Sequence, residues 1–70
     1  MNQIHIDGKN PSNIEIVIWL YRNISNAHIV VDDGIVGVGW KFIFVTQPTF
    51  HFVVTIDDKE LAIEFKLRFL

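Results

Sequence analysis

The last part of the chain alternates between apolar and polar positions. From residue 61 to residue 69 the odd positions hold Leu, Ile, Phe, Leu and Phe, and the even positions hold Ala, Glu, Lys and Arg. Successive side chains of a strand point to opposite faces, so this spacing predicts a strand over Leu61–Phe69. One face of that strand would pack on a core, and the other would present Lys66 and Arg68 outward.

Other segments are predicted to be strands because they are rich in β-branched and aromatic residues and are bounded by turn residues. Asp33-Gly34 is a typical two-residue hairpin turn, and Gly37 and Gly39 indicate a bulge or bend near Trp40. The predicted strands cover Gln3–Ile6, Ala27–Asp32, Ile35–Thr46 and Phe50–Asp57.

The segment from Ser12 to Ile24 fits two structures. As a helix, it would have Ser12 as its N-cap and Glu15 as the capping-box partner. As a strand, it would alternate from Ile14 onward, and its β-branched residues favour that form intrinsically. We expect a helix, because the capping signal is specific and a sheet that is apolar on one face needs a cover. Its apolar stripe would be Ile14, Val17, Ile18, Tyr21 and Ile24.

These elements predict one α+β domain over residues 1–70, with one α-helix packed across a three- to five-stranded antiparallel β-sheet in the order β-α-β-β-β-β. If residues 12–24 formed a strand, the protein would be an all-β sheet or small barrel with largely the same core. A shift of one residue would expose that whole core, so the alternation determines the buried face. The predicted core is Trp40, Phe42, Phe44, Phe50, Phe52, Val54, Ile56 and the odd positions from 61 to 69.

The opposite face of the predicted sheet mixes aliphatic and charged residues. Ile43, Val45 and Val53 form an apolar centre. Antiparallel sheets commonly leave one face to water, but three β-branched aliphatics together exceed what a solvated face needs. We therefore expect this face to bind a partner. The expected partner-binding residues are Lys41, Ile43, Val45, His51, Val53, Lys66 and Arg68.

Composition leaves two explanations for the apolar content. Half of the residues are hydrophobic, including six Phe and two Trp. A 70-residue domain buries only about 60% of its unfolded surface. The apolar residues therefore either fill the core of a small domain or cover a partner or a second copy.

Charge and cysteine content narrow the function classes. The chain has no cysteine, which excludes disulfides and Cys-based zinc sites. A formal net charge of −2 gives no basic footprint for nucleic acid. No segment has the roughly 20 apolar residues of a membrane span, and the N-terminal residues lack signal-peptide features. We expect a cytoplasmic protein with no membrane partner.

Candidate chemistry is sparse. His5 and Asp7 would point the same way from a strand, as a pair of metal ligands does, but such spacing is common by chance. His51 is either a proton switch or contact residue, or an ordinary half-exposed strand residue. The glycine-rich residues 34–39 lack the Lys-Ser/Thr of a P-loop and lead into a strand. We expect no catalytic residue, no metal and no cofactor.

The sequence therefore favours a small non-enzymatic protein that acts by protein–protein interaction, as a steric inhibitor or recruiter of a larger protein. Anti-defence inhibitors encoded by phages and other mobile elements have this size and this lack of chemistry, which is analogy and not a motif. Two alternatives stay open. One is a nucleic-acid or small-ligand binding module that uses the outward face. The other is a self-associating subunit, such as a homodimer, joined through that face or an edge strand.

Overall fold

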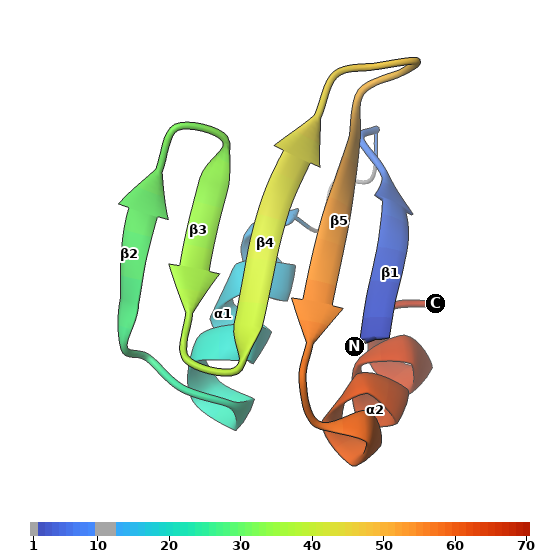
Figure 1. Cartoon of the computed structure of the whole chain (residues 1–70). Coiled ribbons are helices and arrows are strands. Elements are labelled where there is room, and N and C mark those ends of the chain that lie inside the picture. The colour runs from blue at the N-terminus through green and yellow to red at the C-terminus, as the bar shows by residue number, and fades with distance from the viewer. Residues whose placement is uncertain (1, 10–12) are drawn as a thin grey trace.

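The computed structural model describes residues 2–9 and 13–70. The strands form one five-stranded antiparallel sheet in the order β1-β5-β4-β3-β2. Both helices lie on the same side of this sheet, α1 behind β3 and β4 and α2 near β5 and β1 (Figure 1). An α+β fold with an antiparallel sheet is confirmed. The elements are β1 (Asn2–Asp7), α1 (Asn13–Asn23), β2 (His28–Val31), β3 (Gly34–Gly37), β4 (Trp40–Val45), β5 (His51–Ile56) and α2 (Lys59–Phe69).

The strand predicted over Leu61–Phe69 is wrong, because this segment is the second helix, α2. Asp58 caps the helix, and its Oδ1 atom accepts hydrogen bonds from the main-chain N–H groups of Glu60 at 2.8 Å and Leu61 at 3.1 Å. A side-chain acceptor at this position satisfies donors that a helix leaves unpaired at its start. The cap therefore begins a helix where the alternation of residues indicated a strand.

The buried face of α2 follows the helical period. Phe65 and Ala62 are buried, and they lie three positions apart on one face. Ile63 and Leu67 were predicted to lie in the core, yet they are exposed, Leu67 to 82%. The predicted one-helix cover is therefore incomplete, since α2 supplies part of the core together with α1.

The predicted helix in the first half of the chain is confirmed as α1, and the predicted cap Ser12 lies outside the described residues. Its buried residues are Ile16 and Leu20, which lie one turn apart. The predicted stripe is thus shifted around the helix, because Ile14 and Ile18 are exposed. Seven of the eight positions from Ile14 to Tyr21 are apolar, so the sheet that packs on this helix decides which side is buried.

The long strand predicted over Ile35–Thr46 is divided into β3 and β4. Val38 and Gly39 form a two-residue turn between the paired residues Gly37 and Trp40, so the glycines mark a hairpin and not a bulge. Gly39 has φ +85°, a conformation that hairpin turns require and that glycine adopts readily. A Cβ atom at Gly37 would collide with the indole ring of Trp40.

The hairpin predicted at Asp33-Gly34 is present, with its turn one residue earlier. Val31 pairs with Gly34, which leaves Asp32 and Asp33 as the turn between β2 and β3. The loop between β4 and β5 is longer, since Val45 pairs with His51. All three connections join neighbouring strands, as expected for a meander.

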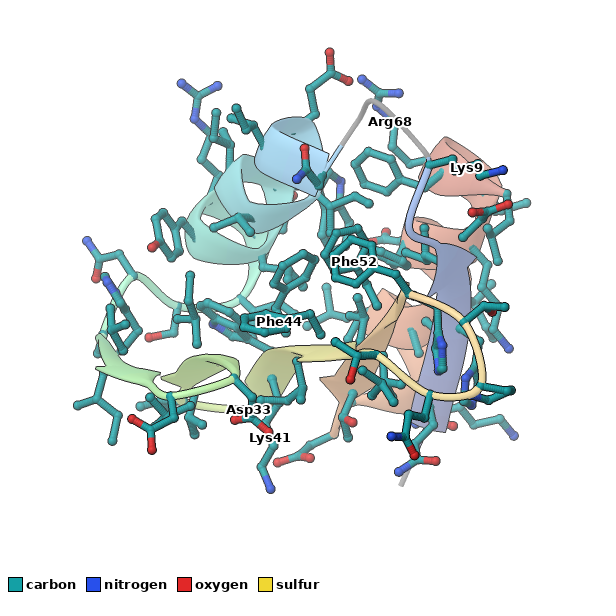
Figure 2. The ribbon with its side chains drawn as sticks, turned by 90° about the horizontal axis from the view of Figure 1, so that it is seen from above. Lys9, Asp33, Lys41, Phe44, Phe52 and Arg68 are labelled. Carbon is teal, nitrogen blue, oxygen red and sulfur yellow. The ribbon has the colours of Figure 1, made fainter. Side chains whose placement is uncertain are left out.

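The core lies between the sheet and the two helices. Phe44 and Phe52 both point toward the helices, and Lys41 points away from them (Figure 2). Phe44 and Phe50 were predicted to lie in the core, yet both are exposed, because they lie at the loop end of the sheet beyond the helices. The buried apolar residues are Ile4, Ile6, Ile16, Leu20, Trp40, Phe42, Phe52, Val54, Ile56, Ala62 and Phe65.

The helical packing of α2 predicts different effects on stability at Phe65 and Leu67, which would both be buried if this segment were a strand. Phe65→Ala should reduce the free energy of unfolding by about 3–5 kcal/mol, because it opens a cavity in the core. Leu67→Ala should change it by less than about 0.5 kcal/mol, since this side chain is exposed. Urea denaturation followed by circular dichroism measures both. Equal losses in the two variants would contradict the helix.

The cap of α2 is tested by Asp58→Ala, which should cost about 1 kcal/mol of stability because two main-chain donors lose their acceptor. Thermal unfolding of this variant measures the loss. Asp57→Ala is the matched control, since the Asp57 side chain is exposed beside the same turn. An equal effect of the two substitutions would indicate that net charge, and not the cap, is responsible.

Candidate functional site

The side of the sheet opposite the helices is an open face, here called the outer sheet face. No helix in the described chain covers it (Figure 1). Because side chains alternate along a strand, each strand contributes every second residue to it. The face consists of Gln3, His5 and Asp7 on β1, Ile29 and Val31 on β2, Gly34 and Val36 on β3, Lys41, Ile43 and Val45 on β4, and His51, Val53 and Thr55 on β5.

The structure brings together one part of the predicted partner-binding set. Residues of β4 and β5 in that set lie on the outer sheet face as directly opposed pairs, with Ile43 opposite Val53 and Val45 opposite His51. Lys41 lies on the same face next to them and is exposed. Side chains of directly opposed residues are about 4.5–5.5 Å apart at Cβ, so these residues contact one another across the strands.

Lys66 and Arg68 are not on this face, because their segment is the helix α2 on the other side of the sheet. Arg68 faces α1, and its Nη2 atom lies 3.9 Å from Oε2 of Glu15. Its guanidinium group is also 5.1 Å from the centroid of the Phe69 ring. Both members of the ion pair are more than half exposed, so it contributes little to stability.

The apolar part of the outer sheet face is wider than the sequence indicated. Val36 pairs with Ile29 on one side and with Lys41 on the other. Gly34 lies between Val31 and Ile43 in the next row, so the apolar band runs from β2 to β5. The aliphatic band consists of Ile29, Val31, Val36, Ile43, Val45 and Val53.

Sequence reasoning missed the contribution of β2 and β3 to this band. The missing signal was the turn at Asp32-Asp33, which determines the register of both strands. Gly34 has no side chain, so the band is lower at its middle. A larger residue does not fit there, because a Cβ atom would overlap the carbonyl oxygen of Phe42. The band also widens at one end into an apolar hollow of about 430 Å³ lined by Ala27, His28, Ile29, Val36, Gly37 and Val38.

Polar residues border the band on the β1 side. The rings of His5 and His51 are 5.6 Å apart between centroids. Nδ1 of His51 lies 2.8 Å from the carbonyl oxygen of Thr49, which holds the ring in place. Asp7 pairs with His51 across the strands, and its Oδ1 atom accepts a hydrogen bond from the main-chain N–H of Lys9 at 2.8 Å.

The suggested metal pair, His5 and Asp7, does share this border. Across residues 2–9 and 13–70 there is no group of three or more His, Cys, Asp or Glu side chains that could hold a metal ion. A second hollow of about 460 Å³ lies beside the border, lined by Asp7, Gly8, Lys9, Thr49, Phe50 and His51. Its lining combines polar side chains with the ring of Phe50, a mixture that also suits a contact surface.

Comparison with known proteins gives no relative from which a function can be transferred. The chain matches no protein-family model, no curated protein and no solved structure. Neither of the helices that the structure describes has the length and apolar character needed to cross a membrane. The functional interpretation therefore rests on the geometry of the outer sheet face.

The assignment of the two sheet faces predicts opposite results at neighbouring positions of β5. Val54→Glu should prevent folding, because it buries a carboxylate in the core. Val53→Glu should keep the fold and reduce stability by about 1 kcal/mol or less, the range of strand propensity. Circular dichroism and urea denaturation measure both variants. An unfolded Val53→Glu variant would place Val53 in the core and contradict the open face.

Proposed function

We propose that this chain is a binding protein that contacts a protein partner through its outer sheet face. The observation that carries the proposal is the aliphatic band from Ile29 to Val53, which lies on the side of the sheet without helices. Protein interfaces combine an apolar centre with a polar rim. Here Lys41, His5 and Asp7 supply polar and charged groups around the band.

The band is suited to binding because its parts are rigid. Its residues are all Val or Ile, whose branched Cβ atoms restrict the side-chain rotamers. They stand on paired strands, so the main chain is ordered before a partner arrives. A rigid surface loses little conformational entropy on association, which favours affinity for a given contact area.

The proposed mechanism is steric and involves no chemical step. The outer sheet face covers a surface of a larger protein, and thereby blocks or recruits it. The bordering charges steer the encounter and set its orientation, as rim charges generally do. This is the action of a compact inhibitor or adaptor.

A nucleic-acid partner is less well supported by the same face. Sheet-based RNA-binding proteins stack bases on aromatic side chains. The phenylalanines of this sheet lie on the helix side, as Phe44 and Phe52 show (Figure 2). Nucleic-acid binding also needs cations, and Lys41 is the one Lys or Arg residue within β4 and β5.

The proposal is tested by affinity capture with three forms of the protein in nuclease-treated lysate of the source or its host. The wild type and Leu67→Glu should retain the same discrete protein, and Val53→Glu should lose it. Leu67 is a matched control because it is an exposed aliphatic residue on α2, away from the outer sheet face. Mass spectrometry identifies the retained protein, and titration calorimetry with the purified protein measures its affinity.

The outcomes separate the alternatives. Equal retention by Val53→Glu would remove the outer sheet face from the site and contradict the proposal. Recovery that depends on nucleic acid, with an affinity that falls steeply with salt, would favour the nucleic-acid alternative. A loss in both glutamate variants would indicate a general effect of added charge, and Ile43→Thr would then replace Val53→Glu in the comparison.

A further inference from the structure

β2 is a short edge strand that carries no protective residue or bulge against pairing. It lies at one end of the sheet, and its sequence is HIVV. Natural edge strands commonly carry Lys, Pro or a bulge that prevents pairing with another strand, and β2 has none of these. Ile29 on the outer sheet face is 64% exposed, and Val30 on the helix side is 76% exposed.

The main-chain groups of β2 that face the open edge can be identified. The N–H of Val38 donates to the carbonyl oxygen of Ala27 at 3.1 Å, and these two residues continue the β2–β3 register. Hydrogen-bonded and non-hydrogen-bonded pairs alternate in an antiparallel ladder. The odd residues of β2 therefore bond to β3, whereas His28 and Val30 direct their N–H and C=O groups away from the sheet.

We propose that β2 pairs antiparallel with β2 of a second copy of this chain, about a two-fold axis. In this arrangement His28 of each copy lies opposite Val30 of the other, and each such pair exchanges two N–H···O=C hydrogen bonds. Ile29 lies opposite the second copy's Ile29 on the outer sheet face. Every edge-facing main-chain group within β2 thereby gains a partner, and the two sheets become one continuous sheet.

Charge favours this antiparallel pairing. The acidic turn Asp32-Asp33 follows β2 directly, and antiparallel pairing places the two acidic turns at opposite ends of the joint. Parallel pairing would bring four carboxylates together, which is unfavourable. A register shifted by two residues would set His28 opposite Asp32, which belongs to the turn and not to the strand. The chosen register uses strand residues alone.

Side chains on both faces support the same joint. On the outer sheet face the two Ile29 residues form a directly opposed aliphatic pair, the closer kind of pair in an antiparallel ladder. On the helix side, Val30 lies next to the second copy's His28. That ring is fixed by stacking on Tyr21 at 4.7 Å between centroids and by its Nδ1 atom 2.7 Å from the carbonyl oxygen of Asn26.

Dimerisation through β2 shares Ile29 with the aliphatic band but does not use the part of the band on β4 and β5. It uses the sheet edge and leaves Ile43, Val45 and Val53 uncovered on the outer sheet face. A variant that loses only the dimer therefore tests β2, and a variant that loses only the partner tests the face.

A disulfide test exploits the absence of cysteine from the chain. Ile29→Cys should form a covalent dimer under mild oxidation, because directly opposed non-hydrogen-bonded residues have Cα atoms about 4.5 Å apart, within disulfide range. Ile14→Cys is the matched control, since Ile14 is 71% exposed on α1. Non-reducing gel electrophoresis should show rapid dimer formation by the first variant alone. Equal rates for both variants would overturn the proposal.

Sedimentation tests the dimer without oxidation. The wild type should reach twice the 8.1 kDa mass of one chain as its concentration rises. Val30→Pro should stay monomeric, because it removes an N–H that the alternation of the ladder directs toward the open edge. Gln3→Pro is the matched control at the β1 edge: Gly8 N–H donates to Phe50 C=O at 3.2 Å, so by the same alternation Gln3 N–H faces outward. It should still dimerise.

A monomeric wild type at all concentrations would overturn the proposal, as would a dimer that persists in Val30→Pro. Circular dichroism checks that both proline variants fold. If Val30→Pro does not fold, amide exchange of the wild type decides: the amides of His28 and Val30 should become protected as concentration rises. Exchange that does not depend on concentration at these two amides would equally exclude the pairing.

Discussion

The structure depends on one constraint: the two helices of residues 2–9 and 13–70 cover one face of the sheet and leave the other open (Figure 1). Two 11-residue helices pack on the face that carries Trp40, Phe42 and Phe52. Phe65 joins them from α2, and its ring meets Trp19 of α1 edge-on at 5.5 Å between centroids. The aromatic side chains thus gather in one layer, where a small domain most needs buried area. The aliphatic band is left on the uncovered side.

Strand pairing transmits that constraint to the whole sheet. Short turns join β2 to β3 and β3 to β4, so the position of one residue determines which face every later residue occupies. Trp40 anchors the register from the helix side, since its indole N–H donates to the carbonyl oxygen of Ser25 at 2.9 Å. The same register places Ile43 against Val53 on the outer sheet face. The strand register therefore determines both which residues pack in the core and which residues form the outer sheet face.

Sequence reasoning succeeded where periodicity and turn chemistry agreed, and it failed where two periods fitted the same residues. The alternation in β4 and β5 identified Phe52 and Val54 as core, and the structure buries both. Residues 61–69 alternate as in a strand, but Ala62 and Phe65 are three positions apart and therefore also share one face of a helix. The pattern alone could not distinguish a strand from a helix. The evidence for a helix was Asp58, which is a good N-cap as well as a turn residue.

That misassignment also explains why the predicted site was only partly brought together. Lys66 and Arg68 were placed beside Val53 because a strand at the end of the chain would have continued the sheet. The structure instead puts β1 beside β5, a long-range pairing of residues 2–7 with residues 51–56 that no local pattern encodes. His5 and Asp7 consequently border the band where Lys66 and Arg68 were expected. The border is formed by histidine and carboxylate groups in place of two cations.

The two open edges of the sheet differ in a way that bears on both proposals. β1 has polar side chains facing outward, and α2 packs near it on the helix side. β2 is short, uncharged when His28 is neutral, and exposed on both faces. If β2 pairs with a second copy, the aliphatic bands of two chains become continuous across the joint through Ile29. A partner with repeated or two-fold symmetric surfaces would then contact both copies at once, and the second contact would form at high effective concentration. Edge pairing and partner binding by the outer sheet face would in that way each increase the affinity of the other.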